Sequence, residues 1–146
     1  MNRQLADVNV LLALLWPRHE SHTAAHAWFA KSGHRGWATN PLTQLGMLRL
    51  LTNPSVTQDA VSAATTLEVL REAVSHPGHE FWPLHRELMP ALKPFRTGVT
   101  GHRQWADALL LWQAADRDGV LVTFDSRVRE LAAAHFGGRV LVLKRH

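Results

Sequence analysis

Leu5-Ala6-Asp7-Val8-Asn9-Val10-Leu11-Leu12 is the stretch of sequence that decides the fold. Its apolar run, interrupted by one acid, predicts a buried strand over residues 4–8 that turns directly into a helix, and Pro17 ends that helix. Farther along, Val120-Leu121-Val122-Thr123-Phe124 predicts a second buried strand, and Asp125 follows it. Strands and helices alternate between and beyond these two runs, which is the signature of an α/β fold.

The remaining elements follow from apolar periodicity and from the residues that begin and end helices. Asn40-Pro41 begins a helix well, because Asn caps the first turn and Pro suits the first helical position. Asn53-Pro54 ends that helix, and Ser55 with Gln58 resembles a capping box at the start of a longer one. We expect further strands at residues 37–39, 80–82 and 139–143, and helices at 22–31, 41–51, 55–75, 85–92, 104–117 and 127–135.

Length and composition favour one domain over residues 1–146, because 46% of these residues are hydrophobic and can form one core. The apolar runs are far shorter than the roughly 20 residues of a membrane span, and the first residues lack the long apolar stretch of a signal peptide. The absence of cysteine excludes disulfides, Cys-based zinc sites and a Cys nucleophile. We therefore expect a cytoplasmic protein, whose net charge of +4 suits a polyanionic partner.

Three acids fall at informative places in this pattern. Asp7 and Asp125 each lie at the carboxyl end of a predicted strand, where open α/β sheets bind their ligands. Asp107 interrupts an apolar run in the first turns of its helix, so it can point back towards the same edge of the sheet. Three carboxylates that converge without a Lys or Arg nearby would repel one another, and a hard cation such as Mg²⁺ or Mn²⁺ would relieve this repulsion. The chemistry that follows is metal-assisted phosphoryl transfer.

Each acid also has a simpler structural interpretation. Asp7 and Asp125 would each cap the helix that follows them, and Asp107 would be an exposed helix residue. We favour a shared site over three separate structural roles, because one crevice accounts for all three positions at once.

The order of the motifs resembles a known family. Asp7-Val8-Asn9-Val10-Leu11-Leu12 resembles the opening motif of PIN domains, and residues 43–54 resemble the second motif of one VapC subgroup. Residues 100–110 and 121–125 resemble the third and fourth motifs. The match covers nearly the whole chain with the motifs in order, so the sequence is similar to PIN-domain ribonucleases, and in particular to VapC-type toxins of VapBC toxin–antitoxin systems.

This resemblance implies a PIN-like fold, in which a central, mostly parallel sheet is flanked by helices. It implies an endoribonuclease that depends on Mg²⁺ or Mn²⁺ and cuts structured RNA such as tRNA or rRNA. It also implies homodimerisation and neutralisation by a small VapB-type antitoxin. The residues carried over are the acidic metal site of Asp7, Asp107 and Asp125, and the supporting residues Asn9, Thr123 and Thr43.

One position departs from the family, because the second motif usually carries a Glu where this chain has Gln44. With Asn40 as the helix cap, Gln44 lies in the first turn near the edge of the sheet, so we expect it to reach the catalytic site. A neutral amide offers an oxygen but no charge, which predicts one well-held metal ion and an activity that is retained but low.

Basic residues beside these motifs are candidates for binding RNA. His102 and Arg103 come just before Asp107 and are placed to contact phosphate. Arg49 lies five residues after Gln44 and would pair with RNA or with the other subunit.

Two other functions remain open on the sequence. With Gln44 in place of an acid, the chain would bind RNA or a partner protein without efficient cleavage. An aspartyl phosphatase or receiver-like domain would use Asp7 as a phosphate acceptor, but Asp7-Val8-Asn9 lacks a second Asp two residues on.

Overall fold

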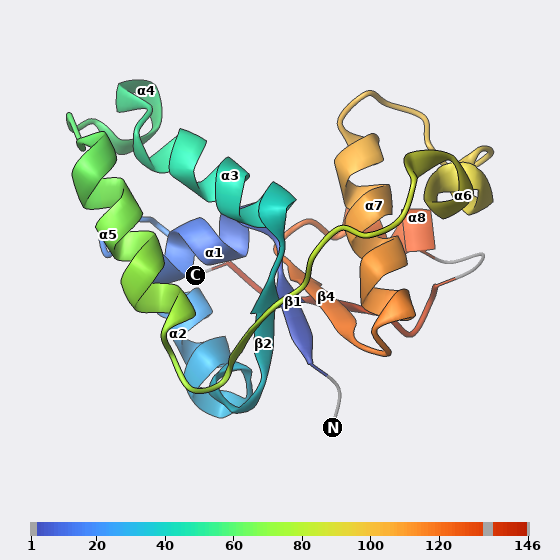
Figure 1. The fold of residues 1–146 in the computed structure, drawn as a ribbon, viewed down its shortest axis with the longest axis horizontal. Helices are drawn as coiled ribbons and strands as arrows, with labels where there is room; N and C mark the ends of the chain where they lie inside the picture. The colour runs from blue at the N-terminus through green and yellow to red at the C-terminus, as the bar shows by residue number, and fades with distance from the viewer. Residues whose placement is uncertain (1–2, 133–135, 146) are drawn as a thin grey trace.

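The fold is built around one parallel sheet, seen in a computed structural model that describes residues 3–132 and 136–145. Its five strands run in the order β3-β2-β1-β4-β5, and every neighbouring pair is parallel (Figure 1). The strands are β1 Gln4–Ala6, β2 Trp37–Thr39, β3 His79–Phe81, β4 Val120–Thr123 and β5 Val140–Val142. The predicted α/β class and parallel sheet are confirmed.

Helices cover the sheet on both sides, with α1, α2, α3 and α5 on one side and α6, α7 and α8 on the other (Figure 1). The α-helices are α1 Val8–Leu15, α2 His22–Lys31, α3 Pro41–Leu51, α4 Pro54–Thr57, α5 Ala63–Val74, α6 Leu88–Leu92, α7 Gln104–Asp116 and α8 Arg127–Ala132, with short 3-10 turns at Gly33–Arg35 and Lys93–Phe95. No helix in the described part of the chain is long and apolar enough to cross a membrane.

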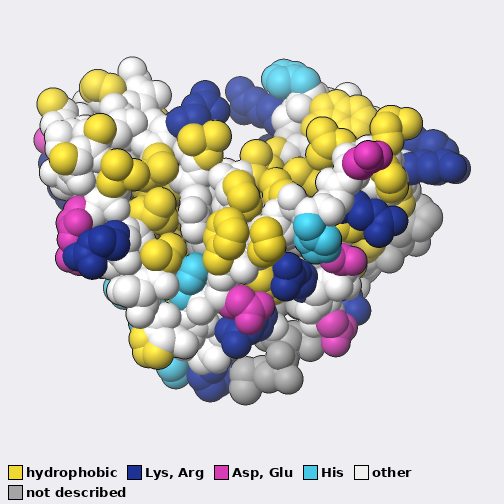
Figure 2. All heavy atoms as spheres, in the orientation of Figure 1, with side chains coloured by type: hydrophobic (Ala, Val, Ile, Leu, Met, Phe, Trp, Pro, Cys, Tyr) yellow, Lys and Arg dark blue, Asp and Glu magenta, His cyan; other side chains and the backbone are white. Residues whose placement is uncertain are grey.

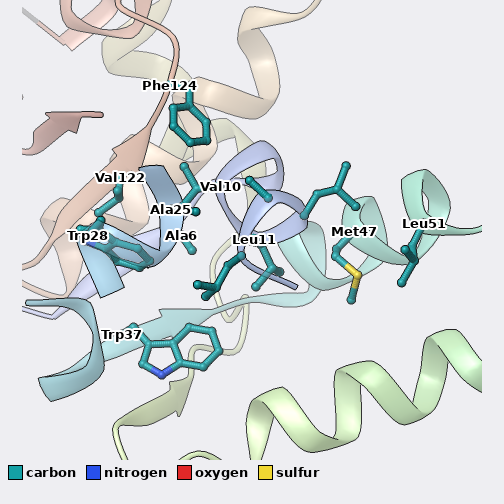
Figure 3. Packing of buried hydrophobic residues seen from close by; sticks show 13 residues of the cluster. Ala6, Val10, Leu11, Ala25, Trp28, Trp37, Met47, Leu51, Val122 and Phe124 are labelled. Carbon is teal, nitrogen blue, oxygen red and sulfur yellow. The ribbon is translucent and has the colours of Figure 1, made fainter. Parts of the chain in front are cut away.

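Two hydrophobic cores lie on the two faces of the sheet, because successive strand residues point to opposite faces. Ala6 and Val122 contribute to the core formed with α1, α2 and α3 (Figure 3). Their neighbours Leu5 and Leu121 contribute to the core formed with α7 and α8. Burial on both faces explains why these strands carry apolar residues at successive positions instead of alternating them with polar residues.

The pairing of β1 with β4 sets the position of the candidate site. Ala6 lies opposite Val122, and the Asp7 N–H continues the ladder by donating to the Val122 carbonyl at 2.9 Å. The chain segments that leave the carboxyl ends of these two strands are therefore adjacent. Val8 was expected to lie in the strand, but it is the first residue of α1, because the Asp7 side chain accepts a hydrogen bond from the Val8 N–H and caps the helix there.

The helix expected over residues 55–75 is wrong, since the chain forms two helices there. Asn53 caps the short helix α4, which ends at Gln58 in the left-handed region with φ 62°. Ser62 then caps α5 by accepting a hydrogen bond from the Thr65 N–H at 3.1 Å. The capping box expected from Ser55 and Gln58 is therefore not formed.

Smaller differences occur in the second half of the chain. The helix expected over 85–92 begins only at Leu88, and the strand expected over 80–82 is shifted by one residue to His79–Phe81. Of the helix expected over 127–135, α8 covers Arg127–Ala132, and residues 133–135 lie outside the described residues.

Candidate active site

Three acidic side chains line one cleft at the carboxyl-end edge of the sheet. Asp7 follows β1, Asp125 follows β4, and Asp107 lies in the first turn of α7. Together with their neighbours they border a cavity of about 520 Å³. The structure thus brings together residues that are up to 118 positions apart in the sequence, from Asp7 to Asp125.

Asp7 is buried and has two protein partners. Its Oδ1 accepts from the Val8 N–H at 2.7 Å, and its Oδ2 accepts from the Thr123 hydroxyl at 2.8 Å. Burial raises the pKa of this carboxyl, while the hydrogen bonds from Thr123 and Val8 oppose the rise and the nearby Asp125 adds to it. Asp7 therefore caps a helix, as the simpler interpretation holds, and also lines the cleft.

Asp107 is half-buried and has no hydrogen-bond or ion-pair partner among the described residues. Burial, and then repulsion from Asp7 and Asp125, raise the pKa of this carboxyl from 3.8 to about 7, against an opposing effect of Arg127. A carboxylate that is costly to ionise and faces two other acids is a feature of functional sites, because the protein alone does not compensate its charge.

The pKa of Asp125 shifts in the opposite direction, because this carboxylate is paired with a cationic side chain. The Arg127 guanidinium donates from Nε to Oδ1 and from Nη2 to Oδ2, each at 3.0 Å. This fork lowers the pKa of Asp125, and burial opposes it with a smaller effect. The Asp125 N–H also donates to the Thr123 hydroxyl oxygen at 3.1 Å, so Thr123 connects the two strand-end acids.

The acids supply the right ligand chemistry for a hard divalent cation, since such ions prefer carboxylate oxygens. In the arrangement seen here, no three His, Asp or Glu side chains within residues 3–132 and 136–145 are placed to hold a metal ion. The fork from Arg127 engages both oxygens of Asp125. A cation bound by all three acids would therefore either share an Asp125 oxygen with Arg127 or displace the guanidinium.

The supporting residues divide into two groups. Asn9 is exposed and lines the acidic cleft. Thr43 is buried and completes a capping box: its Oγ1 accepts from the Asn40 N–H at 3.0 Å, and its N–H donates to Asn40 Oδ1 at 2.8 Å. Thr43 thus supports the start of α3 and does not contact the three acids.

Gln44 lies in the expected turn of α3, but it does not line the acidic cleft, so the expectation that it reaches the acids needs correction. Its Nε2 donates to the Thr39 hydroxyl at 2.9 Å, and its side chain lines a separate cavity of about 410 Å³ with Leu67, Leu70 and Phe81. The structure therefore does not place Gln44 with the three acids.

Among the basic candidates, His102 and Arg103 are exposed and line the acidic cleft, whereas Arg49 is exposed on α3 and lines neither cavity. Sequence reasoning missed other lining residues, among them Gln104 and Arg127. The only signal for Arg127 was its position two residues after an acid at the start of a helix.

A parallel α/β sheet with three acids in one cleft at the carboxyl ends of its strands places this chain among α/β proteins with a candidate active site at that edge. The sequence profile of the PIN domain matches residues 5–134. The chain is 41% identical to Ribonuclease VapC39 of Mycobacterium tuberculosis over 130 residues, which is 89% of this chain and 94% of that protein. It is 40% identical to Ribonuclease VapC38 of the same organism over 128 residues, covering 88% and 89% of the two chains.

A structural comparison agrees with this result. The crystal structure of VapBC2 from Rickettsia felis, bound to a DNA fragment from their promoter, contains a chain that is similar with a TM-score of 0.56. The match covers 84% of this chain and 87% of that chain at 14% identity, so it supports the fold alone. The chain belongs to the PIN-domain family, in its VapC branch. The family predicted from the motifs is confirmed, and a receiver-like domain has no support.

Proposed function

We propose that this chain is an endoribonuclease toxin that hydrolyses phosphodiester bonds in structured RNA, tRNA or rRNA, with Mg²⁺ or Mn²⁺ as cofactor. The observation that carries the proposal is the shared cleft of Asp7, Asp107 and Asp125. The relatives named as ribonucleases support the activity. A cleft of carboxylates repels a phosphodiester unless a cation lies between them, so an RNA substrate and a metal cofactor belong to the same proposal.

The cation would be held by Asp7, Asp107 and Asp125. The raised pKa of Asp7 and of Asp107, caused first by burial, supports this assignment, because a bound cation would compensate their charge. When bound, such an ion supplies Lewis-acid activation of water and neutralises charge that develops on the phosphate. Thr123 would act through Asp7, since its hydroxyl fixes the orientation of that carboxylate.

The wall of the cleft next to α7 would receive the RNA backbone. The Gln104 Oε1 accepts hydrogen bonds from the Thr100 N–H at 2.6 Å and from the Gly101 N–H at 3.2 Å, and so holds the preceding loop. His102 and Arg103 extend from this loop along the cleft. We expect them to contact phosphate oxygens, which position RNA without reading its sequence.

Exposed hydrophobic side chains suggest where protein partners bind. They gather on the face formed by α3, α5, α6 and α7 (Figure 2). The large exposed hydrophobic residues include Leu45 on α3, Leu67 on α5, Leu88 and Met89 on α6 and Trp105 on α7, with Phe81 and Leu84 in the segment between α5 and α6. Exposed apolar surface of this kind marks interfaces. We assign this exposed apolar surface to a homodimer contact and to a VapB-type antitoxin that neutralises the enzyme. We further propose that residues 1–146 form one domain and that the enzyme acts in the cytoplasm.

A second candidate function is a PIN-like module that binds RNA or a partner with little or no cleavage. Gln44 favours it, because this position offers no charge and its side chain is turned to Thr39. The site would then hold its cation weakly.

The two functions separate in a cleavage assay. Purified total tRNA and rRNA are incubated with the antitoxin-free protein, with and without Mn²⁺, beside the Asp107→Asn variant. Metal-dependent cutting that disappears in the variant supports the nuclease. If the folded protein binds RNA and Mn²⁺ but produces no cut at enzyme concentrations equal to the RNA, the binding module is the better account.

A further inference from the structure

Arg127, the first residue of α8, binds one of the acids of the cleft directly. Its guanidinium forks onto the Asp125 carboxylate through two hydrogen bonds of 3.0 Å, and its own N–H donates to Asp125 Oδ1 at 2.9 Å. The side chain lines the same cavity as the three acids. Arg and carboxylate match well in such a bidentate contact.

This contact is strong in geometry but exposed to solvent. The Arg127 side chain is 78% exposed, and an exposed ion pair contributes little to stability because solvent screens it. The backbone of Arg127 is held more firmly, because the next residue, Val128, is buried in the core beneath α8. The guanidinium can therefore leave Asp125 at little cost, while the base of the side chain stays at the mouth of the cleft.

The contact competes with the proposed metal ion for one ligand. Both Asp125 oxygens are engaged by Arg127, and a divalent ion held by three carboxylates needs at least one of them. The double positive charge of a divalent ion beside Asp125 would also repel the Arg127 guanidinium. A bound cation thus favours release of the guanidinium, and an RNA that reaches the acids passes within reach of it.

We propose that Arg127 exchanges between two partners, the Asp125 carboxylate in the metal-free protein and a phosphate of bound RNA in the metal-loaded protein. This assignment rests on the proposed function. It makes Arg127 a substrate-binding residue that becomes more available when the metal site is filled. Arginine suits both partners, since its planar fork matches carboxylate and phosphate alike.

The test compares Arg127→Ala with Arg129→Ala, which removes the same charge two residues farther along α8. Arg129 is exposed and does not line the cleft. Calorimetric titration of Mn²⁺ should show about two- to fivefold tighter binding to Arg127→Ala than to Arg129→Ala, the range expected for loss of an exposed competing ion pair.

A second titration measures RNA binding, with total bacterial tRNA as the probe. Ca²⁺ replaces Mn²⁺ so that the probe is not consumed, since Ca²⁺ also takes oxygen ligands. With Ca²⁺, Arg127→Ala should bind more weakly than Arg129→Ala, and the slope of log affinity against log salt should fall by about 0.7–0.9, the loss of one phosphate contact. In EDTA the difference in tRNA affinity between the two variants should be smaller than with Ca²⁺. Arg127→Lys, which keeps the charge without the fork, should retain most of the salt slope.

The outcomes distinguish this proposal from the proposed function. If the unmodified protein binds Mn²⁺ but the two alanine variants agree in both titrations, the exchange is refuted and the metal site stands. Tighter Mn²⁺ binding without a metal-dependent loss of tRNA binding also refutes it, because Arg127 then only competes for Asp125. If the unmodified protein binds no Mn²⁺, the metal site fails, and the exchange fails with it.

Discussion

Replacing Asp107 by Asn should stabilise the metal-free protein at pH 8. The pKa of Asp107 is raised from 3.8 to about 7, first by burial and then by Asp7 and Asp125. A rise of this size in pKa corresponds to about 4 kcal/mol, at about 1.36 kcal/mol for each pH unit. Asp107 is only half-buried, so solvent screening reduces this figure, and we expect about 1–2 kcal/mol. The substitution removes no hydrogen bond of the described residues, which leaves the loss of charge as its main effect.

The stability difference between the variant and the unmodified protein should depend on pH. A carboxyl whose pKa is higher in the folded than in the unfolded state binds its proton more tightly when folded. Its contribution to stability is therefore full below the unfolded pKa and is lost as pH rises from about 4 towards the folded value near 7. Asn cannot ionise, so the variant should exceed the unmodified protein at pH 8, and the gap should narrow towards pH 5.

Thermal unfolding in EDTA at the two pH values measures the effect. A gain of about 1–2 kcal/mol corresponds to a rise in Tm of about 3–7 °C for a chain of this size. Glu72→Gln is the control, because it removes one exposed carboxylate from α5, away from the cleft. The reasoning is refuted if Asp107→Asn is no more stable than Glu72→Gln at pH 8, or if its advantage is the same at pH 5.

Three further substitutions test the surroundings of the site. Thr123→Val removes the hydroxyl that donates to buried Asp7, so urea unfolding should show a loss of about 1–3 kcal/mol, and no loss would mean that this bond is immaterial. Gln44→Glu restores the acid usual in the family but points into a different cavity, so Mn²⁺ affinity should change less than twofold; a tenfold gain would place this side chain at the metal. Gly46→Ala would set a methyl group 2.6 Å from the Val8 side chain, so Tm should fall by the equivalent of about 1–3 kcal/mol of stability. An unchanged Tm would show that α3 moves freely against α1.

The parts of the fold that sequence reasoning predicted well are those fixed by burial. The apolar runs that became β1 and β4 are buried on both faces, so their pattern alone indicates strands, and the acids that follow them necessarily share an edge. The start of α3 was likewise predictable, because Asn40 caps the helix and Pro41 suits its first position.

The errors lie where a neighbour distant in sequence decides the local conformation. Residues 55–75 are rich in helix-forming residues, yet the chain turns at Gln58, next to Thr57, whose buried hydroxyl donates to the Asp59 carbonyl at 3.1 Å. Arg18, 41 residues away, pairs with Asp59 and holds this turn against α1 and its following loop. The sequence around residues 55–75 does not indicate that contact.

Side-chain direction within the site was also beyond the sequence. Gln44 stands in the expected turn of α3, but the Thr39 hydroxyl and the groove beside α5 decide where its amide points. The fork between Arg127 and Asp125 depends on the start of α8 folding back beside the acid, which spacing alone does not reveal.

The most direct test of the three-acid site is calorimetric titration of Mn²⁺ into the protein and into the variants Asp7→Asn, Asp107→Asn and Asp125→Asn, with Glu72→Gln as the control. One shared site predicts a single binding event that weakens at least about tenfold in each of the three variants and is unchanged in the control, since each removes one charged ligand. Mn²⁺ binding that survives unchanged when any one of the three acids is replaced would contradict the shared site.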